Sequence, residues 1–319
     1  MNLRGMRQIL LIFCLWLAAG AVYAQQSAQY TQYIFNGLII NPAYAGTKEI
    51  LNANAMYRSQ WAGLEGAPTT QTFAADGALK NNRLGVGLQV VNDKVGAQGR
   101  LNILASGSVH LPVSYEGRLS FGLAGGVSQY SIDGSMLKTV NPNDPAIPNS
   151  KFSSLLPDAQ AGVYFHTEQF YAGFSGANLI GAKSDYVLTP ERHYFLTSGY
   201  VFNLGSMVKF KPSFLLKSDF KAPTNLDLNT FVLFAERLWL GASYRTGVHL
   251  LPEASLDKDL GMKNAVAGIV ELYLTKKIKI GYAHDFTLTG LSEYASHEFS
   301  LGYYFLKKDD SRMLTPRYF

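Results

Sequence analysis

Cysteine, charge and long hydrophobic runs are all scarce in this chain. The only cysteine among its 319 residues is Cys14, and Asp, Glu, Lys and Arg together make up 16% of the sequence. With one cysteine there is no disulfide framework, so stability must come from packing and backbone pairing. After residue 24 no segment holds about 18 consecutive apolar residues, which excludes membrane-spanning helices there.

Aromatic residues and glycines are plentiful instead. Aromatic residues reach 13%, which excludes a disordered chain, and there are 30 glycines. Few charges and many aromatics, without long apolar runs, favour a β-rich protein with an apolar exterior.

The first 24 residues have the pattern of a secretory signal peptide. Arg4 and Arg7 are positively charged, residues 9–22 are apolar, and Ala24 is a small residue suited to cleavage. We therefore expect an exported chain that begins near Gln25.

Along the rest of the chain, apolar residues alternate with small or polar ones, which predicts β-strands. In residues 118–128, Phe121 and Leu123 share one face, and Ser120 and Gly122 share the other. A transmembrane barrel directs its apolar face to lipid and its small or polar face to the lumen. Small residues on the second face favour a barrel over a soluble sandwich.

The pattern predicts an all-β fold, a 14-stranded antiparallel transmembrane β-barrel over residues 49–306. The predicted strands are 49–60, 69–80, 83–92, 99–112, 117–130, 157–167, 169–179, 191–203, 206–218, 225–236, 238–248, 262–275, 277–288 and 296–306. Short connections follow the even-numbered strands and longer ones follow the odd-numbered strands, which is typical of outer-membrane barrels with short periplasmic turns. Both termini are then periplasmic, and residues 307–319 form a periplasmic tail.

Residues 25–48 precede the first strand and have no partner hairpin. Two alternatives stay open for them: an amphipathic cap packed under the barrel, or a plug folded into the lumen.

Charged residues within the predicted strands are expected to face the lumen. Arg58 lies in a weakly polar strand, so its side chain should point inward, where a partner or water can meet it. Lys209, Lys211 and Lys217 share one predicted lumen face, where they are either solvated or attract an anion or an acidic peptide. Trp61 ends its strand, where an indole suits the membrane interface.

The sequence lacks the patterns typical of catalysis, and we expect no enzymatic activity, no cofactor and no metal. The six histidines form no close pair, and His-Glu-x-x-His and Gly-x-Ser-x-Gly motifs are absent. His297-Glu298 has no second ligand nearby, which favours a structural role. Asn141, Asn143 and Asp144 could offer oxygens to Ca²⁺, but a Pro/Asn-rich loop explains them better. No aromatic-interleaved basic patch suggests nucleic acid.

Several motifs resemble the PorP/SprF family of type IX secretion system outer-membrane proteins. The resemblance rests on residues 32–36, on residues 41–46, and on the run from residue 58 to residue 70. The site residues that it implies, as contacts of a plug or a partner, are Asn36, Asn41, Pro42, Tyr44, Gly46, Arg58, Gln60, Trp61, Gly66 and Pro68. The family pattern predicts an aromatic residue at position 284, and His284 departs from it.

The resemblance implies an outer-membrane barrel in the machinery of protein secretion and gliding. Its expected partners are outer-membrane lipid, type IX components of the periplasmic ring, a peptidoglycan-associated protein, and a secreted adhesin or the C-terminal region of a secreted substrate. The competing interpretation is a FadL-like outer-membrane transporter of small hydrophobic molecules, since such channels also carry Asn-Pro-Ala in an N-terminal plug. The run from Arg58 to Pro68 favours the first interpretation.

Overall fold

The computed structural model describes residues 28–79, 82–137, 150–181, 191–220, 222–248 and 263–306. The predicted signal peptide, the predicted tail 307–319 and the loop residues Asn141, Asn143 and Asp144 lie outside these ranges. Among the described residues, no helix combines the length and the apolar character needed to cross a membrane.

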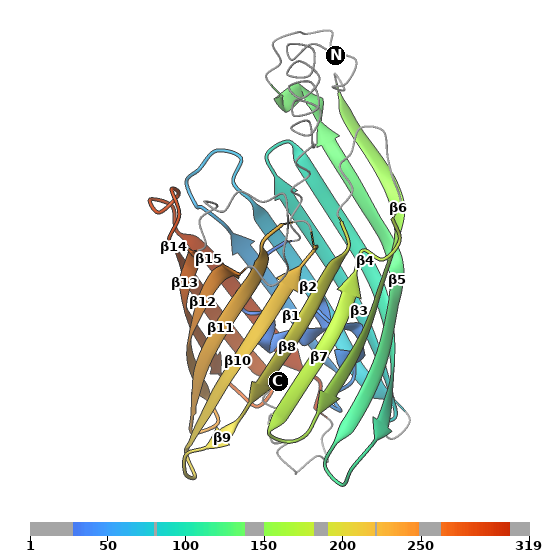
Figure 1. Ribbon diagram of the computed structural model, residues 1–319, viewed down its shortest axis with the longest axis vertical. Coiled ribbons are helices and arrows are strands. Elements are labelled where there is room, and N and C mark those ends of the chain that lie inside the picture. Colours follow the sequence, from blue (N-terminus) through green and yellow to red (C-terminus); the bar gives the residue numbers. More distant parts are fainter. Residues whose placement is uncertain are drawn as a thin grey trace, which may run out of the picture.

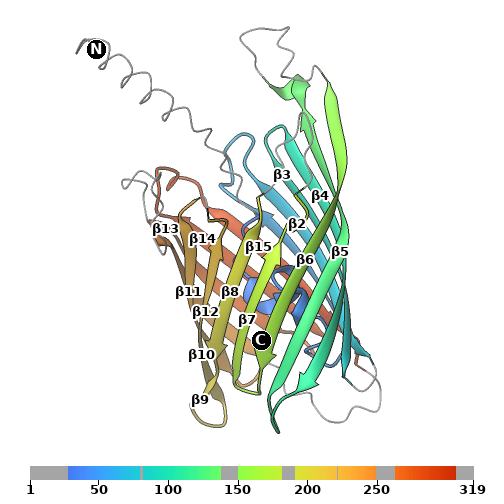
Figure 2. The ribbon, with the colours of Figure 1, turned by 45° about the vertical axis from the view of Figure 1, so that its right-hand side comes forward.

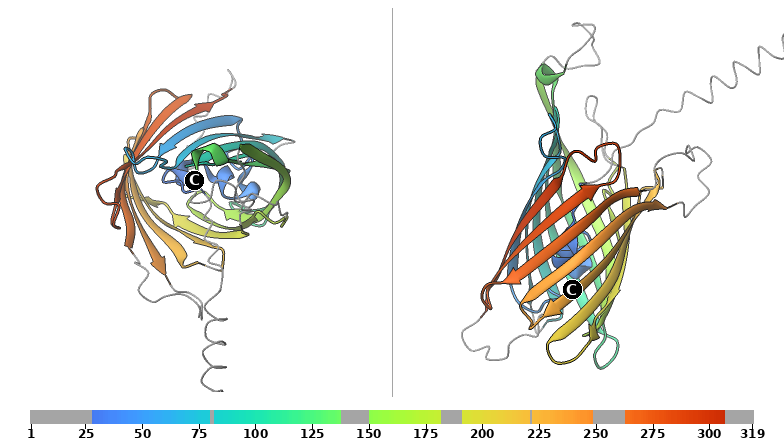
Figure 3. Two further views of the ribbon diagram at one scale, coloured as in Figure 1. Left: turned by 90° about the horizontal axis from the view of Figure 1, so that it is seen from above. Right: turned by 90° about the vertical axis from the view of Figure 1, so that its left-hand side faces the viewer.

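The strands form one closed antiparallel barrel (Figures 1 and 3). They are β1 (Asn52–Ser59), β2 (Thr69–Leu79), β3 (Leu84–Val95), β4 (Gln98–Pro112), β5 (Arg118–Asp133), β6 (Lys151–His166), β7 (Phe170–Ala177), β8 (His193–Tyr200), β9 (Phe202–Asn203), β10 (Val208–Ser218), β11 (Thr224–Phe234), β12 (Leu238–Val248), β13 (Lys263–Tyr273), β14 (Ile278–Thr287) and β15 (Ser296–Tyr304).

Closure of the ring comes from the first and last strands. Asn52–Ser59 of β1 pairs with residues 297–304 of β15, and each other strand pairs with its neighbour in the chain. β8 and β9 both pair with β10 and are separated only by Val201, so together they act as one strand. The prediction of a 14-stranded antiparallel barrel is therefore confirmed.

Side chains alternate between the outside and the inside of the barrel as predicted. On β5, Phe121 and Leu123 are exposed on the outer face, whereas Ser120 and Ala124 are buried on the inner face. An apolar outer face is typical of a barrel that crosses a membrane.

Residues 28–51 enter the ring of strands before β1 begins (Figure 3, left). They contain three short 3₁₀ helices, η1 (Tyr33–Phe35), η2 (Gly37–Ile39) and η3 (Pro42–Tyr44). Asn41 caps η3, because its Oδ1 accepts a hydrogen bond of 2.9 Å from the Ala43 backbone N–H.

Glycines in the wall let this segment approach closely. A Cβ atom at Gly122 on β5 would clash with the backbone of Ala43, and one at Gly85 on β3 would clash with the carbonyl of Ala45. The small inner-face residues therefore make room for the chain's own N-terminal segment.

The start of β6 differs from the prediction. The strand begins at Lys151 and not at residue 157, and Pro157 pairs opposite Val127 of β5 within it. The Ala159 carbonyl accepts from Leu179 N–H on the side away from β5. Backbone groups of every second residue in a strand face the same side, so Pro157, two residues before Ala159, also faces away from β5. Its missing N–H therefore removes no hydrogen bond between β5 and β6. The β5–β6 hairpin consequently rises beyond the other strands (Figures 1 and 2).

The connection between β3 and β4 also differs. Only Gly96 and Ala97 join these strands, so the expected longer connection after an odd-numbered strand is wrong here. Gly96 has a φ of +55°, which glycine adopts readily and which allows a tight hairpin turn.

We predict that a cation on the outer face impairs insertion more than the same cation in a turn. Leu123, 70% exposed, pairs with both β4 and β6 in the wall. Leu123→Arg there should cost about 2–4 kcal/mol near the bilayer midplane. Tyr115→Arg is the control, because Tyr115 is fully exposed in the β4–β5 turn. Folding into lipid vesicles, read from heat-modifiable gel migration, should fall for Leu123→Arg alone, and equal yields would contradict the face assignment.

Candidate functional site

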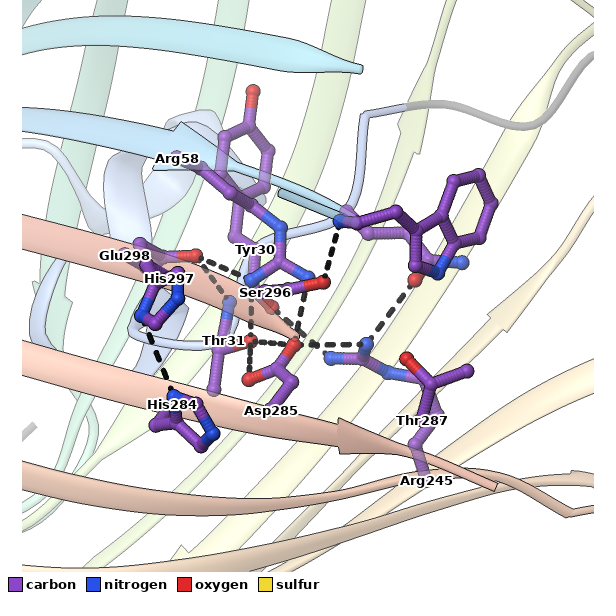
Figure 4. A network of polar contacts seen from close by, with 12 residues as sticks. Tyr30, Thr31, Arg58, Arg245, His284, Asp285, Thr287, Ser296, His297 and Glu298 are labelled. Atoms are coloured by element: carbon purple, nitrogen blue, oxygen red, sulfur yellow. Dashed lines mark hydrogen bonds and ion pairs between the residues drawn. The ribbon is translucent and has the colours of Figure 1, made fainter. Parts of the chain in front are cut away.

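A buried cluster of charges lies on the strands that close the barrel (Figure 4). Arg58 on β1 donates from Nη2 to Asp285 Oδ2 on β14 at 2.6 Å and from Nη1 to Glu298 Oε2 on β15 at 3.1 Å. The exposed fractions of the three residues are 3%, 2% and 0%. We call Arg58, Asp285 and Glu298 the charged clamp. The predicted inward orientation of Arg58 is confirmed, and its partners are these two carboxylates.

The charged clamp holds the beginning of the N-terminal segment. The two carboxylate oxygens of Glu298 accept from the backbone N–H groups of Thr31 and Gln32 at 2.9 and 2.7 Å. The Thr31 hydroxyl donates to Asp285 at 2.9 Å and accepts from Arg58 Nη1 at 2.8 Å. Each buried charge therefore meets both a counter-charge and a group of the segment, and such charge-assisted bonds are the stronger kind.

A second set of ion pairs continues the clamp around the wall. Asp227 on β11 accepts from Arg245 Nε on β12 and from Lys217 Nζ on β10, each at 3.0 Å. Arg245 also donates to Gln29 Oε1 at 3.1 Å and lies 3.9 Å from Asp285. The charges thus link six strands, β10, β11, β12, β14, β15 and β1, with the N-terminal segment.

The lysines on the β10 face meet partners on neighbouring strands. Lys217 pairs with Asp227, and Lys209 pairs with Glu236 in the β11–β12 turn. Lys211 Nζ lies 5.3 Å from the centre of the Tyr171 ring, in the range of a cation–π contact. The acidic partners of Lys209 and Lys217 therefore come from the adjacent hairpin and not from the same strand.

The remainder of the segment is held by neutral polar contacts and by aromatic packing. Asn41 Nδ2 donates to the carbonyl of Val163 on β6 at 3.0 Å, and Gly46 N–H donates to Asp76 Oδ2 on β2 at 2.8 Å. Burial raises the pKa of the Tyr33 phenol well above its usual range, so this group stays neutral. Its oxygen accepts from Asn229 Nδ2 on β11 at 2.6 Å.

The ten site residues predicted from the sequence fall into two places. The first group lies in the barrel interior and comprises Asn36, Asn41, Pro42, Tyr44, Gly46 and Arg58. The second group lies in the β1–β2 loop and comprises Gln60, Trp61, Gly66 and Pro68.

The β1–β2 loop braces the rim of the barrel. The Gln60 N–H donates to the Pro68 carbonyl, and the Gly66 carbonyl accepts from the Gly96 N–H of the β3–β4 turn, each at 2.9 Å. The Trp61 N–H donates to Ser296 Oγ at 3.0 Å. These four residues therefore join neighbouring connections, and the structure does not bring them into the charged clamp.

Sequence reasoning missed the acidic half of the clamp. Asp285 and Glu298 lie on inward positions of β14 and β15, so both offered a counter-charge for Arg58. The missing information was that β15 pairs with β1, which puts Glu298 directly opposite Arg58.

The expectation that no histidines form a close pair is wrong for two of them. His284 and His297 lie opposite each other on β14 and β15, and their Nδ1 atoms are 3.3 Å apart. Within the described residues, no three or more side chains of histidine, cysteine, aspartate or glutamate gather to hold a metal ion.

We predict that removing the clamp's cation strongly destabilises the barrel. Arg58→Ala leaves Asp285 and Glu298 buried without their closest positive partner, which typically costs about 3–5 kcal/mol. Arg118→Ala is the matched control, because Arg118 pairs with Glu49 but is 34% exposed, so its loss should cost about 1 kcal/mol or less. Urea unfolding in lipid vesicles measures both free energies. Equal losses in the free energy of unfolding would show that the charged clamp stabilises the barrel no more than the exposed pair of Arg118 and Glu49 does.

Solved structures of bacterial outer-membrane proteins share this barrel fold. The toluene transporter TbuX of Ralstonia pickettii is similar with a TM-score of 0.51 and 9% identity, over 86% of this chain and 93% of that chain. A FadL homologue of Pseudomonas aeruginosa is similar with a TM-score of 0.45 and 11% identity, over 86% of this chain and 94% of that chain. Omp33 of Acinetobacter baumannii is similar with a TM-score of 0.44 and 11% identity, over 81% of this chain and 98% of that chain. At such identities the likeness is one of fold.

Sequence comparison identifies the family. No curated protein sequence matches the chain. The family model described as type IX secretion system membrane protein PorP/SprF matches residues 22–303, which is most of the chain. The chain therefore belongs to the PorP/SprF family of type IX secretion system membrane proteins.

Proposed function

We propose that this protein is an outer-membrane component of the type IX secretion and gliding machinery. In this proposal it anchors or displays a secreted adhesin, or the C-terminal region of a secreted substrate, at the cell surface. The observation that carries the proposal is the bonding of the N-terminal segment to the barrel wall through the charged clamp. A barrel filled by its own chain is better suited to anchoring than to conducting.

The N-terminal segment acts as a plug in this proposal. Its partners come from strands all around the ring: Asp76 on β2, Ser108 on β4, Val163 on β6, Ser175 on β7, Asn229 on β11, Arg245 on β12 and Glu298 on β15. A segment that contacts so many strands occupies the cross-section of the lumen. This arrangement supports a plug over a cap packed under the barrel.

The short turns supply a surface for the periplasmic partners. In the proposed orientation these turns and the end of β15 face the periplasm, where they contact the periplasmic ring and a peptidoglycan-associated protein. The expectation of a periplasmic N-terminus does not fit this orientation, because Ala28 and Gln29 lie beside the β10–β11 loop, at the end opposite the short turns. Tyr115, Leu204 and Met207 are exposed in the turns. Tyrosine and methionine are enriched at protein interfaces, which supports a docking role for this end.

The opposite end offers a place for an extended polypeptide. β6 pairs with β5 along its whole length but with β7 only from Ala161 to His166. Between Ser153 and Asp158 it therefore has a strand neighbour on one side only, among the described residues. Pro157 supplies no N–H to this edge, so an extended segment of a secreted protein would add to it through the backbone groups of Ser153 and Leu155.

The transporter alternative fits the interior less well. A cavity lined by Ala28, Gln29, Phe195 and Pro223, among others, has a volume of about 30 Å³. This cavity has room for about two water molecules, whereas pockets for small organic ligands occupy about 300–1,000 Å³. A small hydrophobic molecule would fit in this cavity only if Ala28 and Gln29 of the N-terminal segment moved away.

We predict that deleting Gln25–Lys48 leaves an inserted barrel that no longer secretes or displays its partner. The strands keep their backbone pairing without the segment, and water can solvate the exposed clamp. Cells that carry the deletion are compared with cells that carry Arg118→Ala, by measuring barrel level and surface-displayed protein. Normal display by the deletion variant would contradict a functional plug.

Photo-crosslinking in cells identifies the partner. A crosslinking residue at Leu155, on the β6 edge, should capture the C-terminal region of a secreted protein, identified by mass spectrometry. The same residue at Leu123, on the outer face of the wall, is the control and should capture lipid. Lipid alone at both positions would contradict the proposed docking edge.

A further inference from the structure

Two histidines lie on the apolar outer face of the barrel. His284 has the same parity on β14 as the exposed Ile280 and Phe286, and His297 has the same parity on β15 as the exposed Phe299. An imidazole on an apolar surface needs a polar partner. The carboxylates of Asp285 and Glu298, the next residues in the chain, are not such partners, because they point inward to Arg58.

Three side-chain atoms converge at this point. The Nδ1 atoms of His284 and His297 are 3.3 Å apart, and the Tyr282 Oη lies 2.9 Å from His297 Nδ1 and 3.4 Å from His284 Nδ1. The two imidazole ring centres are 4.9 Å apart, so the rings turn their Nδ1 atoms toward each other (Figure 4).

The three separations describe one face of a coordination polyhedron. Zinc binds imidazole nitrogen at about 2.0–2.1 Å in tetrahedral sites, so that neighbouring ligands lie about 3.3 Å apart. The edges of 2.9, 3.3 and 3.4 Å fit this spacing. A hydrogen bond accounts for the 2.9 Å contact between Tyr282 and His297, but it accounts less well for the other two contacts, because 3.3 and 3.4 Å exceed the usual range of about 2.7–3.2 Å.

We propose that His284, His297 and Tyr282 form a binding site for one divalent transition-metal ion of the zinc type on the outer face of the barrel. Imidazole nitrogens suit Zn²⁺ and Cu²⁺, and the phenol oxygen is the third donor. Three protein ligands leave at least one position for water or for an oxygen of a neighbouring molecule.

The site lies toward the end of the wall that carries the loop 288–295. His284 lies near the end of β14 and His297 near the start of β15, on either side of the loop 288–295. The Phe286 ring packs edge-on against the His284 ring with centres 4.4 Å apart, which fixes the orientation of that imidazole. The site is separate from the charged clamp, which lies on the inner face of the same two strands.

Metal binding by the purified full-length protein tests the proposal. The protein is prepared in detergent micelles without a histidine tag, titrated with Zn²⁺ by calorimetry, and loaded with Cu²⁺ for electron paramagnetic resonance. We expect one equivalent of Zn²⁺ to bind, and we expect the Cu²⁺ spectrum to show two nitrogen ligands. Either His284→Ala or His297→Ala should weaken Zn²⁺ binding by more than about tenfold. Tyr282→Phe should weaken it less.

Two further variants keep the test decisive. His193→Ala removes a histidine of β8, far along the ring from β14, and should leave Zn²⁺ binding unchanged. His284→Phe keeps an apolar outer face, so it provides a folded variant if His284→Ala fails to insert. Binding that survives in both histidine variants, or a Cu²⁺ spectrum without nitrogen ligands, would overturn the proposal.

Discussion

The structure depends on the requirement that every backbone N–H and C=O in a membrane be hydrogen-bonded within the protein. Strands meet this requirement only when the first one pairs with the last, and here the pairing joins β1 to β15. Arg58 and Glu298 face each other across that pairing and also bind the N-terminal segment. Closing the barrel and holding the N-terminal segment therefore rest on the same residues.

Contact with the N-terminal segment explains the composition of the inner face. Gly85 and Gly122 leave room for the backbone of the segment, and the buried charges are placed where its N–H groups and hydroxyl can meet them. A buried ion pair is expensive to desolvate and is best explained when it fixes a specific arrangement, here the seating of the segment. This organisation is consistent with the proposed anchoring role.

The sequence predicted those features that depend on residues close together in the chain. Alternation along each strand predicted the fold, the number of strands and the inward side chain of Arg58. It could not predict Arg58 with Asp285, which depends on pairing between distant strands, or His284 beside His297, which depends on the register of the β14–β15 hairpin. The early start of β6 was missed because Pro157 normally interrupts a strand, and only the orientation of its missing N–H makes it acceptable there.

The central claim is that the N-terminal segment, held by the charged clamp, closes the lumen. Conductance across a planar lipid bilayer tests it most directly. The account predicts no steady current through the intact protein and a stable, open-channel current through the variant that lacks Gln25–Lys48. Equal steady currents through both proteins would contradict it.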